Sequence, residues 1–112
     1  MLRYLPFLVA IAAASPTCAA DLEIANSAKV PLYEVYLSRI DETHWRPDML
    51  GPSGGPLAPG AVRVLPGIEA GVYNLRIVDV DGRECELDAV TIETLARIEL
   101  TDVKLTECTS SN

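Results

Sequence analysis

Carboxylates are the most concentrated group of chemically active side chains in this sequence of 112 residues. The segment 79–88, DVDGRECELD, opens with the pattern D-x-D-G, which resembles the start of a calcium-binding loop. An EF-hand loop needs a glycine at its sixth position and a glutamate at its twelfth, whereas Gly82 is fourth when Asp79 is first. The spacing therefore favours a β-hairpin with an acidic outer face, and we expect no metal site.

Catalysis by a nucleophile and a base would depend on His44, because it is the only histidine. A zinc site needs further His or Cys ligands, and the chain offers only cysteines that are better explained by a disulfide. No serine stands in a nucleophile-elbow motif. We therefore expect no catalytic residues, no cofactor and a protein that is not an enzyme. A small hydrolase that uses paired carboxylates stays open as an alternative.

The only tryptophan, Trp45, lies in HWRPDMLG (residues 44–51), which continues into the turn-forming run PSGGPLAPG. Residues 41–59 show little strand character, and loops of this length in compact domains are usually functional or disordered. In one interpretation, Trp45 and Leu50 fold back and close one end of the core. In the other, Trp45 stays partly exposed and anchors a ligand or partner. The residues of this possible ligand or partner loop are Trp45, His44, Asp48 and Leu50.

The first 20 residues, MLRYLPFLVAIAAASPTCAA, have the pattern of a secretory signal peptide. Arg3 supplies the positive start, residues 5–14 form an apolar run, and small residues precede a cleavage site after Ala20. The apolar run is too short for a transmembrane helix, which needs about 20 residues. Acylation of Cys18, as in a lipoprotein, fits less well, because SPTC is a poor match to the required small residues. We expect a cleaved signal peptide at 1–20, a periplasmic or secreted protein, and no membrane span in the mature form.

Cleavage at that site would leave two cysteines, Cys85 and Cys108. An even number of cysteines in an exported protein indicates a disulfide, which would stabilise a small domain by about 3 kcal/mol. If a turn centres near residues 93–94, however, Cys85 faces Asp102, six residues before Cys108. Cysteines whose Cα atoms are more than about 7 Å apart cannot be joined. The disulfide therefore requires the chain to fold back after Asp102.

Alternating apolar and polar residues predict strands along most of the chain. The expected strands, each with the side chains that share one face, are DLEIA (Leu22, Ile24), LYEVYLSRI (Tyr33, Val35, Leu37), AVRVL (Val62, Val64), VYNLRIVDV (Tyr73, Leu75, Ile77), RECELDAV (Cys85, Leu87, Ala89) and LARIELTDV (Ala96, Ile98, Leu100). Asp81-Gly82 marks a hairpin turn, and no segment has a convincing helical period. We expect residues 21–112 to form one all-β domain, a small antiparallel β-sandwich of immunoglobulin-like or Greek-key type with about six to seven strands.

The chain is acidic, with 16 Asp and Glu against 9 Lys and Arg and a net charge of −7. Loss of residues 1–20 would remove only Arg3, which leaves 8 basic and 16 acidic side chains and a net charge of −8. Such a surface repels the phosphates of nucleic acids and the headgroups of anionic membranes. We therefore expect neither as a partner.

The order of several short motifs resembles that of a group of small exported bacterial hypothetical proteins. The motifs of that group run Asn-x-Ser/Thr, Leu-Tyr-x-Ser, Trp-Gly-x-Asp-x-Leu, Leu-x-Pro-Gly, Tyr-Asp-Leu-Arg and Asp-x-Asp-Gly-x-Glu. Here NSAKVPLYEVYLSR, HWRPDMLG, LAPG, VYNLRIVDVDGRE and RIEL stand in the same order, over residues 26–100. Arg46-Pro47 replaces the Gly after the Trp, and Asn74 replaces the Asp. The resemblance implies a compact β-sandwich, and it supplies no catalytic residues because that group has no established activity.

The sequence thus favours a non-catalytic binding or interaction module of the bacterial envelope. Its partner, an envelope protein or a ligand, is not identified by any motif. A structural accessory domain of the envelope without a ligand is the alternative, together with the small hydrolase.

Overall fold

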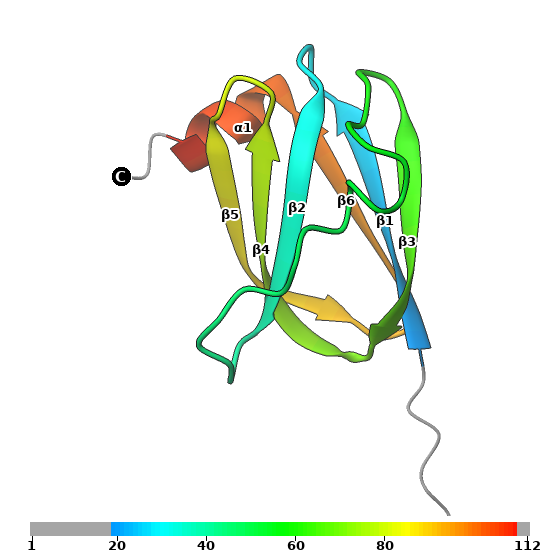
Figure 1. Ribbon diagram of the computed structural model, residues 1–112. Coiled ribbons are helices and arrows are strands. Elements are labelled where there is room, and N and C mark those ends of the chain that lie inside the picture. Colours follow the sequence, from blue (N-terminus) through cyan, green and yellow to red (C-terminus); the bar gives the residue numbers. More distant parts are fainter. Residues whose placement is uncertain (1–18, 110–112) are drawn as a thin grey trace, which may run out of the picture.

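The computed structural model describes residues 19–109 and shows a β-sandwich with one short helix (Figure 1). Its elements are β1 (Ala19–Ser27), β2 (Leu32–Arg39), β3 (Val62–Glu69), β4 (Gly71–Asp79), β5 (Glu84–Ile92), β6 (Leu95–Thr101) and α1 (Asp102–Thr109). One sheet has the strand order β3-β1-β6 and the other β2-β4-β5. The chain changes sheet at every connection between strands except the β4–β5 hairpin. The predicted small β-sandwich is confirmed.

The sheets are antiparallel except where β1 lies beside β6. These two strands are parallel, with Glu23 next to Arg97 and Ile24 next to Ile98. Parallel neighbours need a long connection, and here all the strands from β2 to β5 lie between them in the sequence. The β3-β1-β6 sheet is therefore mixed, which alternation alone could not reveal, because it fixes the face of a side chain and not the neighbour of a strand.

The core lies between the sheets and is built from the inward-facing residues of the strands. Leu22 and Ile24 of β1 and Ile77 of β4 have no exposed surface, as their alternation predicted. Tyr73 of β4 is also fully buried, and its hydroxyl donates a hydrogen bond to the carbonyl oxygen of Glu69 (2.5 Å). This bond satisfies the polar group that the large side chain carries into the core.

The predicted face of β2 is wrong at one residue, because the strand contains an irregularity. The pairing of β2 with β4 shifts register between Leu32 and Glu34. Such a bulge places two residues opposite one and reverses the side-chain alternation. Tyr33, expected to face inward, is therefore 51% exposed, and Leu32 is buried in its place. Val35 is buried as expected.

A second irregularity corrects the prediction for β5. The pairing with β4 shifts register between Tyr73 and Leu75, and Ala89 has a positive φ of 55°. The main-chain N–H of Ala89 donates to Oδ1 of Asn74 (3.1 Å), which holds the distorted backbone in place. Ala89 is therefore exposed instead of inward, and Ile92 is fully buried beyond it.

Strand β3 presents its valines outward. Val62 and Val64 share a face as predicted, but that face is the outer one, where they are 52% and 45% exposed. Leu65 and Ile68 are the residues of β3 that enter the core. Arg63, between the two valines, is partly buried because its guanidinium reaches the main chain of residues 50–56.

Helix α1 is the element that the sequence did not predict, since Asp102 and Val103 were assigned to the last strand. The hydroxyl oxygen of Thr101 accepts a hydrogen bond from the N–H of Lys104 (3.1 Å), as an N-cap does. Asp102 places a negative charge in the first turn, which the helix dipole favours. The chain thus leaves β6 as a helix and turns back over β5 (Figure 1).

This helix resolves the geometric problem of the two cysteines. A helix rises about 1.5 Å per residue, whereas a strand rises about 3.3 Å, so the six residues after Asp102 advance far less than an extended tail. Cys85 and Cys108 form a disulfide with a Cα–Cα distance of 4.6 Å. The expected pairing is therefore present.

The predicted signal peptide lies, apart from its last two residues, outside the described residues. Ala19 and Ala20 begin β1, and Ala20 is buried opposite Ile68 of β3. Cleavage after Ala20 would leave β1 to begin at Asp21. Within residues 19–109, no helix has the length and apolar character that crossing a membrane requires.

Candidate functional site

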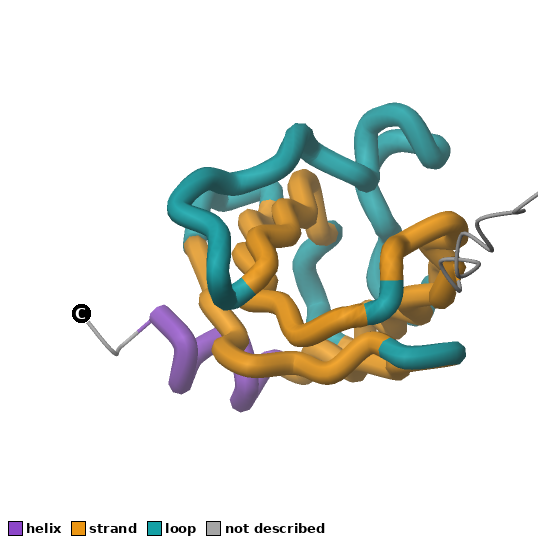
Figure 2. The backbone as a smooth tube through the Cα atoms, turned by 90° about the horizontal axis from the view of Figure 1, so that it is seen from below, coloured by secondary structure: helices purple, strands orange, loops and turns teal. Residues whose placement is uncertain are grey.

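The residues singled out around Trp45 belong to a long connection that we call the covering loop (residues 40–61). It runs from the end of β2 to the start of β3 and closes the side of the sandwich between these two strands (Figure 2). Its main chain bonds to the free edge of β2: the N–H of Arg46 to the carbonyl of Leu37 (2.9 Å), and that of Met49 to Val35 (2.9 Å). The loop is therefore ordered and protects an edge strand from other chains.

Leu57 secures the far end of the covering loop to β2. It exchanges two main-chain hydrogen bonds with Leu32, of 3.0 and 2.8 Å. The side-chain amide of Asn26 donates to the carbonyl oxygens of Leu57 and Val30, both at 2.9 Å. Asn26 is 1% exposed, so these bonds also satisfy a buried polar group.

Asp48 fixes the middle of the covering loop. One carboxylate oxygen accepts hydrogen bonds from the N–H groups of Val35 (2.9 Å) and Leu50 (3.0 Å), and the other accepts one from Gly51 (2.8 Å). A Cβ at Gly51 would lie 2.9 Å from the same carboxylate, so this close approach requires glycine. The aspartate is thus a structural anchor whose oxygens are already used.

Arg63 holds the covering loop from the opposite sheet. Its guanidinium donates to the carbonyl oxygens of Leu50 (3.4 Å), Gly55 and Pro56 (3.5 Å). Three acceptors from one turn match the several N–H groups that guanidinium presents in a fixed plane. The loop is therefore tied both to β2 and to β3.

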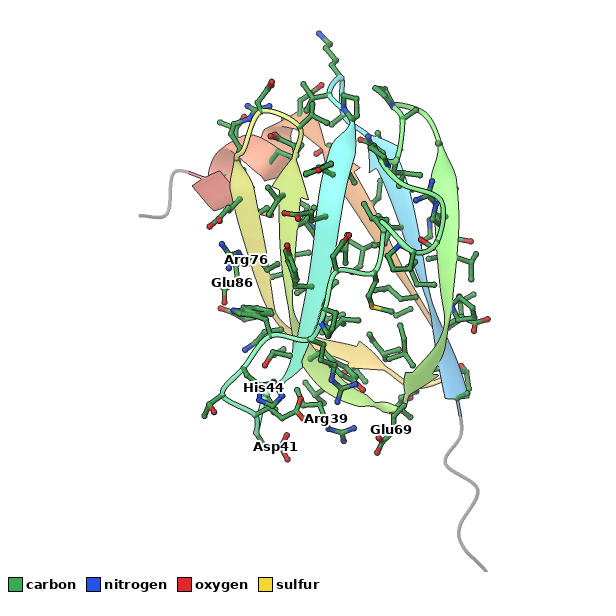
Figure 3. All side chains as sticks on the ribbon, viewed as in Figure 1. Arg39, Asp41, His44, Glu69, Arg76 and Glu86 are labelled. Atoms are coloured by element: carbon green, nitrogen blue, oxygen red, sulfur yellow. A yellow bond between two sulfur atoms is a disulfide. The ribbon has the colours of Figure 1, made fainter. Side chains whose placement is uncertain are left out.

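The four residues predicted as a ligand or partner loop divide into two pairs. Leu50 has no exposed surface and belongs to the core, so it fills the role of a plug. Asp48 is occupied by the main chain. Trp45 is half-buried and lies outside the core cluster, and His44 is exposed near the lower end of the molecule (Figure 3). Of these four residues, Trp45 and His44 are the two that are neither in the core nor used to hold the main chain.

Two arginines contact one buried ring close to this end of the molecule. The guanidinium carbons of Arg39 and Arg46 lie 5.6 and 5.4 Å from the centroid of Tyr73, within the range of cation–π interactions. Nη1 of Arg39 lies 3.2 Å from Oε1 of Glu69, and Nη2 of Arg46 lies 3.3 Å from Oε1 of Glu42. Each guanidinium therefore has a carboxylate of the same chain within ion-pair distance.

Glu42 joins the start of the covering loop to β2. Its Oε1 accepts a hydrogen bond from the main-chain N–H of Arg39 (3.0 Å), and this bond lowers the pKa of the carboxyl below its ordinary value. Burial opposes this effect on the pKa, and the neighbouring Arg46 and His44 lower the pKa by smaller amounts. Figure 3 shows His44 at the same end as Arg39 and Asp41.

An open depression lies between the covering loop and β3. It has a volume of about 320 Å³ and is mostly apolar; its lining residues are Asp48, Met49, Pro52, Ser53, Leu65 and Pro66. The sequence did not predict this depression, because the loop and the strand meet only in the fold. The turn-forming run beside Met49 was the only signal in the sequence.

The acidic segment forms the turn and the second strand of the β4–β5 hairpin. The carboxylate of Asp79 is 1% exposed and accepts hydrogen bonds from the N–H of Asp81 (2.9 Å) and of Arg83 (3.0 Å), and from Nε of Arg83 (2.9 Å). Gly82 has φ of 84°, as the turn requires. In the part of the chain that the structure describes, no three His, Cys, Asp or Glu residues are placed to hold a metal ion.

The outer face of the β2-β4-β5 sheet carries charges that pair with one another. The guanidinium of Arg76 lies 5.9 Å from the ring of Tyr36 and forms an ion pair with Glu84. A hydrogen bond with Glu34 raises the pKa of the Tyr36 hydroxyl. Glu86 of β5 lies opposite Arg76 of β4 (Figure 3). These contacts are those of a solvated sheet surface.

The described serine hydroxyls have structural partners. Ser27 donates to Glu99 (2.7 Å), Ser38 to the carbonyl oxygen of Arg39 (3.4 Å), and Ser53 to carbonyl oxygens of the covering loop. None of these serine hydroxyls bonds to His44 in the contacts given above. These bonds therefore do not pair a serine nucleophile with a histidine base.

Comparison of the chain with protein-family models, with curated proteins and with solved structures finds no match. The resemblance to small exported bacterial proteins therefore stays a prediction, and the site must be interpreted from its own geometry.

Proposed function

We propose that the domain is a non-catalytic binding module of the bacterial envelope and that the first part of the covering loop, at His44 and Trp45, contacts its partner. One observation carries the proposal: Trp45 is left outside the core while the loop around it is held from both sheets. Leu50 and Leu57 provide the plug that Trp45 would otherwise have to supply.

A loop that is already ordered in the free protein favours binding, because little conformational entropy is lost when the partner binds. Tryptophan is enriched among the residues that dominate interface energies, since it offers a large apolar surface and one hydrogen-bond donor. The depression beside Met49 gives the same loop a second apolar surface. The partner we expect is therefore an envelope protein or ligand with an exposed apolar or aromatic group.

The disulfide supports the proposed location. Disulfides persist in oxidising compartments such as the periplasm and the extracellular space, and the Cys85–Cys108 bond fits a chain that is exported there. Export directed by residues 1–20 is part of the same proposal.

The test is a pull-down from native envelope extract with the mature domain and two variants. Trp45→Ala should lose the captured partner while keeping the stability of the parent. Tyr33→Ala, which removes an aromatic side chain that is 51% exposed on the β2 bulge, is the matched control and should retain it. Equal capture by Trp45→Ala and the parent, or a loss shared by both variants, would contradict the assigned contact.

A further inference from the structure

On the side of the sandwich opposite the covering loop, the described residues combine a disulfide with a short helix. Helix α1 packs mainly on β5 and less on β6. Cys108 is in its last turn, and Cys85 lies within β5, so the disulfide joins the helix to the sheet. We propose that this disulfide is a redox-sensitive latch, that Cys108 is its point of thiol–disulfide exchange, and that reduction releases α1 while the six strands stay folded.

Few side chains in the described part of helix α1 are buried. Of the α1 side chains that the structure describes, only Leu105 is fully buried, whereas Val103 is 66% exposed. Outside the helix, Oδ1 of Asp102 accepts a hydrogen bond from the N–H of Lys29 (2.9 Å), an exposed contact. Isolated helices shorter than about 12 residues are marginal in water, and α1 has 8 residues. Without the covalent bond, Leu105 supplies the fully buried side chain in the described part of this helix.

The strands do not share this dependence. Each of the six strands is paired with a neighbour over most of its length, and the core between them contains residues from every strand. The other side of the sandwich is closed by the covering loop, which involves neither cysteine. Loss of the disulfide therefore removes one cover and leaves the pairing of the strands intact.

The two cysteines differ in burial, and this difference decides which sulfur an external thiol can attack. Cys85 has no exposed surface, whereas Cys108 is partly exposed. A thiolate of an external dithiol attacks Sγ of Cys108, the S–S bond breaks, and Cys85 leaves as a thiolate that takes up a proton. The second thiol of the reductant then attacks the mixed disulfide and releases Cys108. The protein gains two electrons and two protons, and the dithiol becomes a disulfide; oxidation by a disulfide-bearing oxidoreductase is the reverse.

Backbone chemical shifts of the oxidised chain, of the chain reduced with a phosphine, and of Cys108→Ser test the release of α1. We expect residues 102–109 to move from helical to coil values in the last two samples, while the strands keep their shifts. Thr106→Ser, an exposed change on the same helix, should leave α1 unchanged. Helical shifts that survive reduction would overturn the proposal, as would coil shifts throughout the sandwich.

A second measurement tests the point of exchange without relying on a variant. The oxidised chain is mixed with glutathione, quenched with acid and mapped by mass spectrometry. The mixed disulfide should form on Cys108 in excess over Cys85 by at least about tenfold, because a buried sulfur is inaccessible to an attacking thiol. Equal labelling of the two cysteines, or labelling of Cys85 alone, would contradict Cys108 as the site of attack.

Discussion

The two sides of the sandwich are covered by different chemistry. The side between β2 and β3 is covered by 22 residues without regular structure (40–61), held by main-chain hydrogen bonds and by two buried leucines. The side between β5 and β6 is covered by α1, with one buried leucine and a disulfide. Figure 2 shows the two covers on opposite sides.

The difference shows what each kind of cover needs. A long segment can use many weak contacts, because its main chain follows a strand edge and its buried polar groups find partners there. A helix of two turns is marginal on its own, and here a covalent bond joins it to the sheet. In the covering loop, Arg46, Met49 and Leu57 make the bonds to β2, and Trp45 lies outside the core cluster.

Removing the plug of the covering loop should have the largest effect on stability. We expect Leu50→Ala to lower the free energy of unfolding by about 3 kcal/mol, since truncation of a buried leucine removes transfer energy and leaves a cavity. Urea denaturation measures the change. Leu95→Ala, at a leucine that is 60% exposed, should stay within about 0.5 kcal/mol. Similar losses for the two variants would show that Leu50 is not part of the core.

Removing the central anchor of the loop should have a smaller effect. Asp48→Ala leaves the N–H groups of Val35, Leu50 and Gly51 without their acceptor. Because these groups are only partly buried and water can replace some of the bonds, we expect a loss of about 2 kcal/mol in the same denaturation assay. Asp41→Ala, whose side chain is 79% exposed, is the control. An unchanged stability of Asp48→Ala would mean that the loop holds its shape without the carboxylate.

Removing the tryptophan should cost less than either. Trp45 is outside the core cluster, so we expect Trp45→Ala to change the free energy of unfolding by about 1 kcal/mol or less. Calorimetric melting of the parent and the variant gives the comparison. A loss of several kcal/mol would restore the interpretation in which Trp45 plugs the sandwich and would remove the basis of the proposed function.

Acid should weaken the start of the covering loop through Glu42. The pKa of this carboxyl is lowered in the folded protein, so its stabilising contribution is present above the ordinary value of 4.5 and is lost as the pH falls through the lowered pKa. Glu42→Gln should therefore be less stable than the parent at neutral pH, and the gap should narrow in acid. A gap that stays constant down to low pH would exclude the ionised carboxylate as its cause.

The strands were predictable because side-chain alternation is local. It identified the inward residues of β1, β4 and β6, and it failed at Tyr33 and Ala89, where a bulge depends on the partner strand. It identified the shared face of Val62 and Val64 but not that this face is the outer one, because Leu65 and Ile68 enter the core instead.

The covering loop and helix α1 were less predictable, because each is held in place by residues that are distant in the sequence. Cysteine count indicated the disulfide, yet the helix that makes it possible has no apolar stripe in the sequence. The fold was needed to reduce the four predicted contact residues to Trp45 and His44, because it buries Leu50 and uses the oxygens of Asp48. No local sequence pattern distinguishes a loop residue that fills the core from one that is exposed to a partner.

Amide hydrogen exchange of the oxidised protein, resolved by residue, is the most direct test of a covering loop that is part of the sandwich. We expect the N–H groups of Arg46, Met49 and Leu57 to be protected to nearly the same degree as those of β2, since each donates to a β2 carbonyl. Exchange of these three amides at the rate of an unstructured chain, beside a protected β2, would contradict the account.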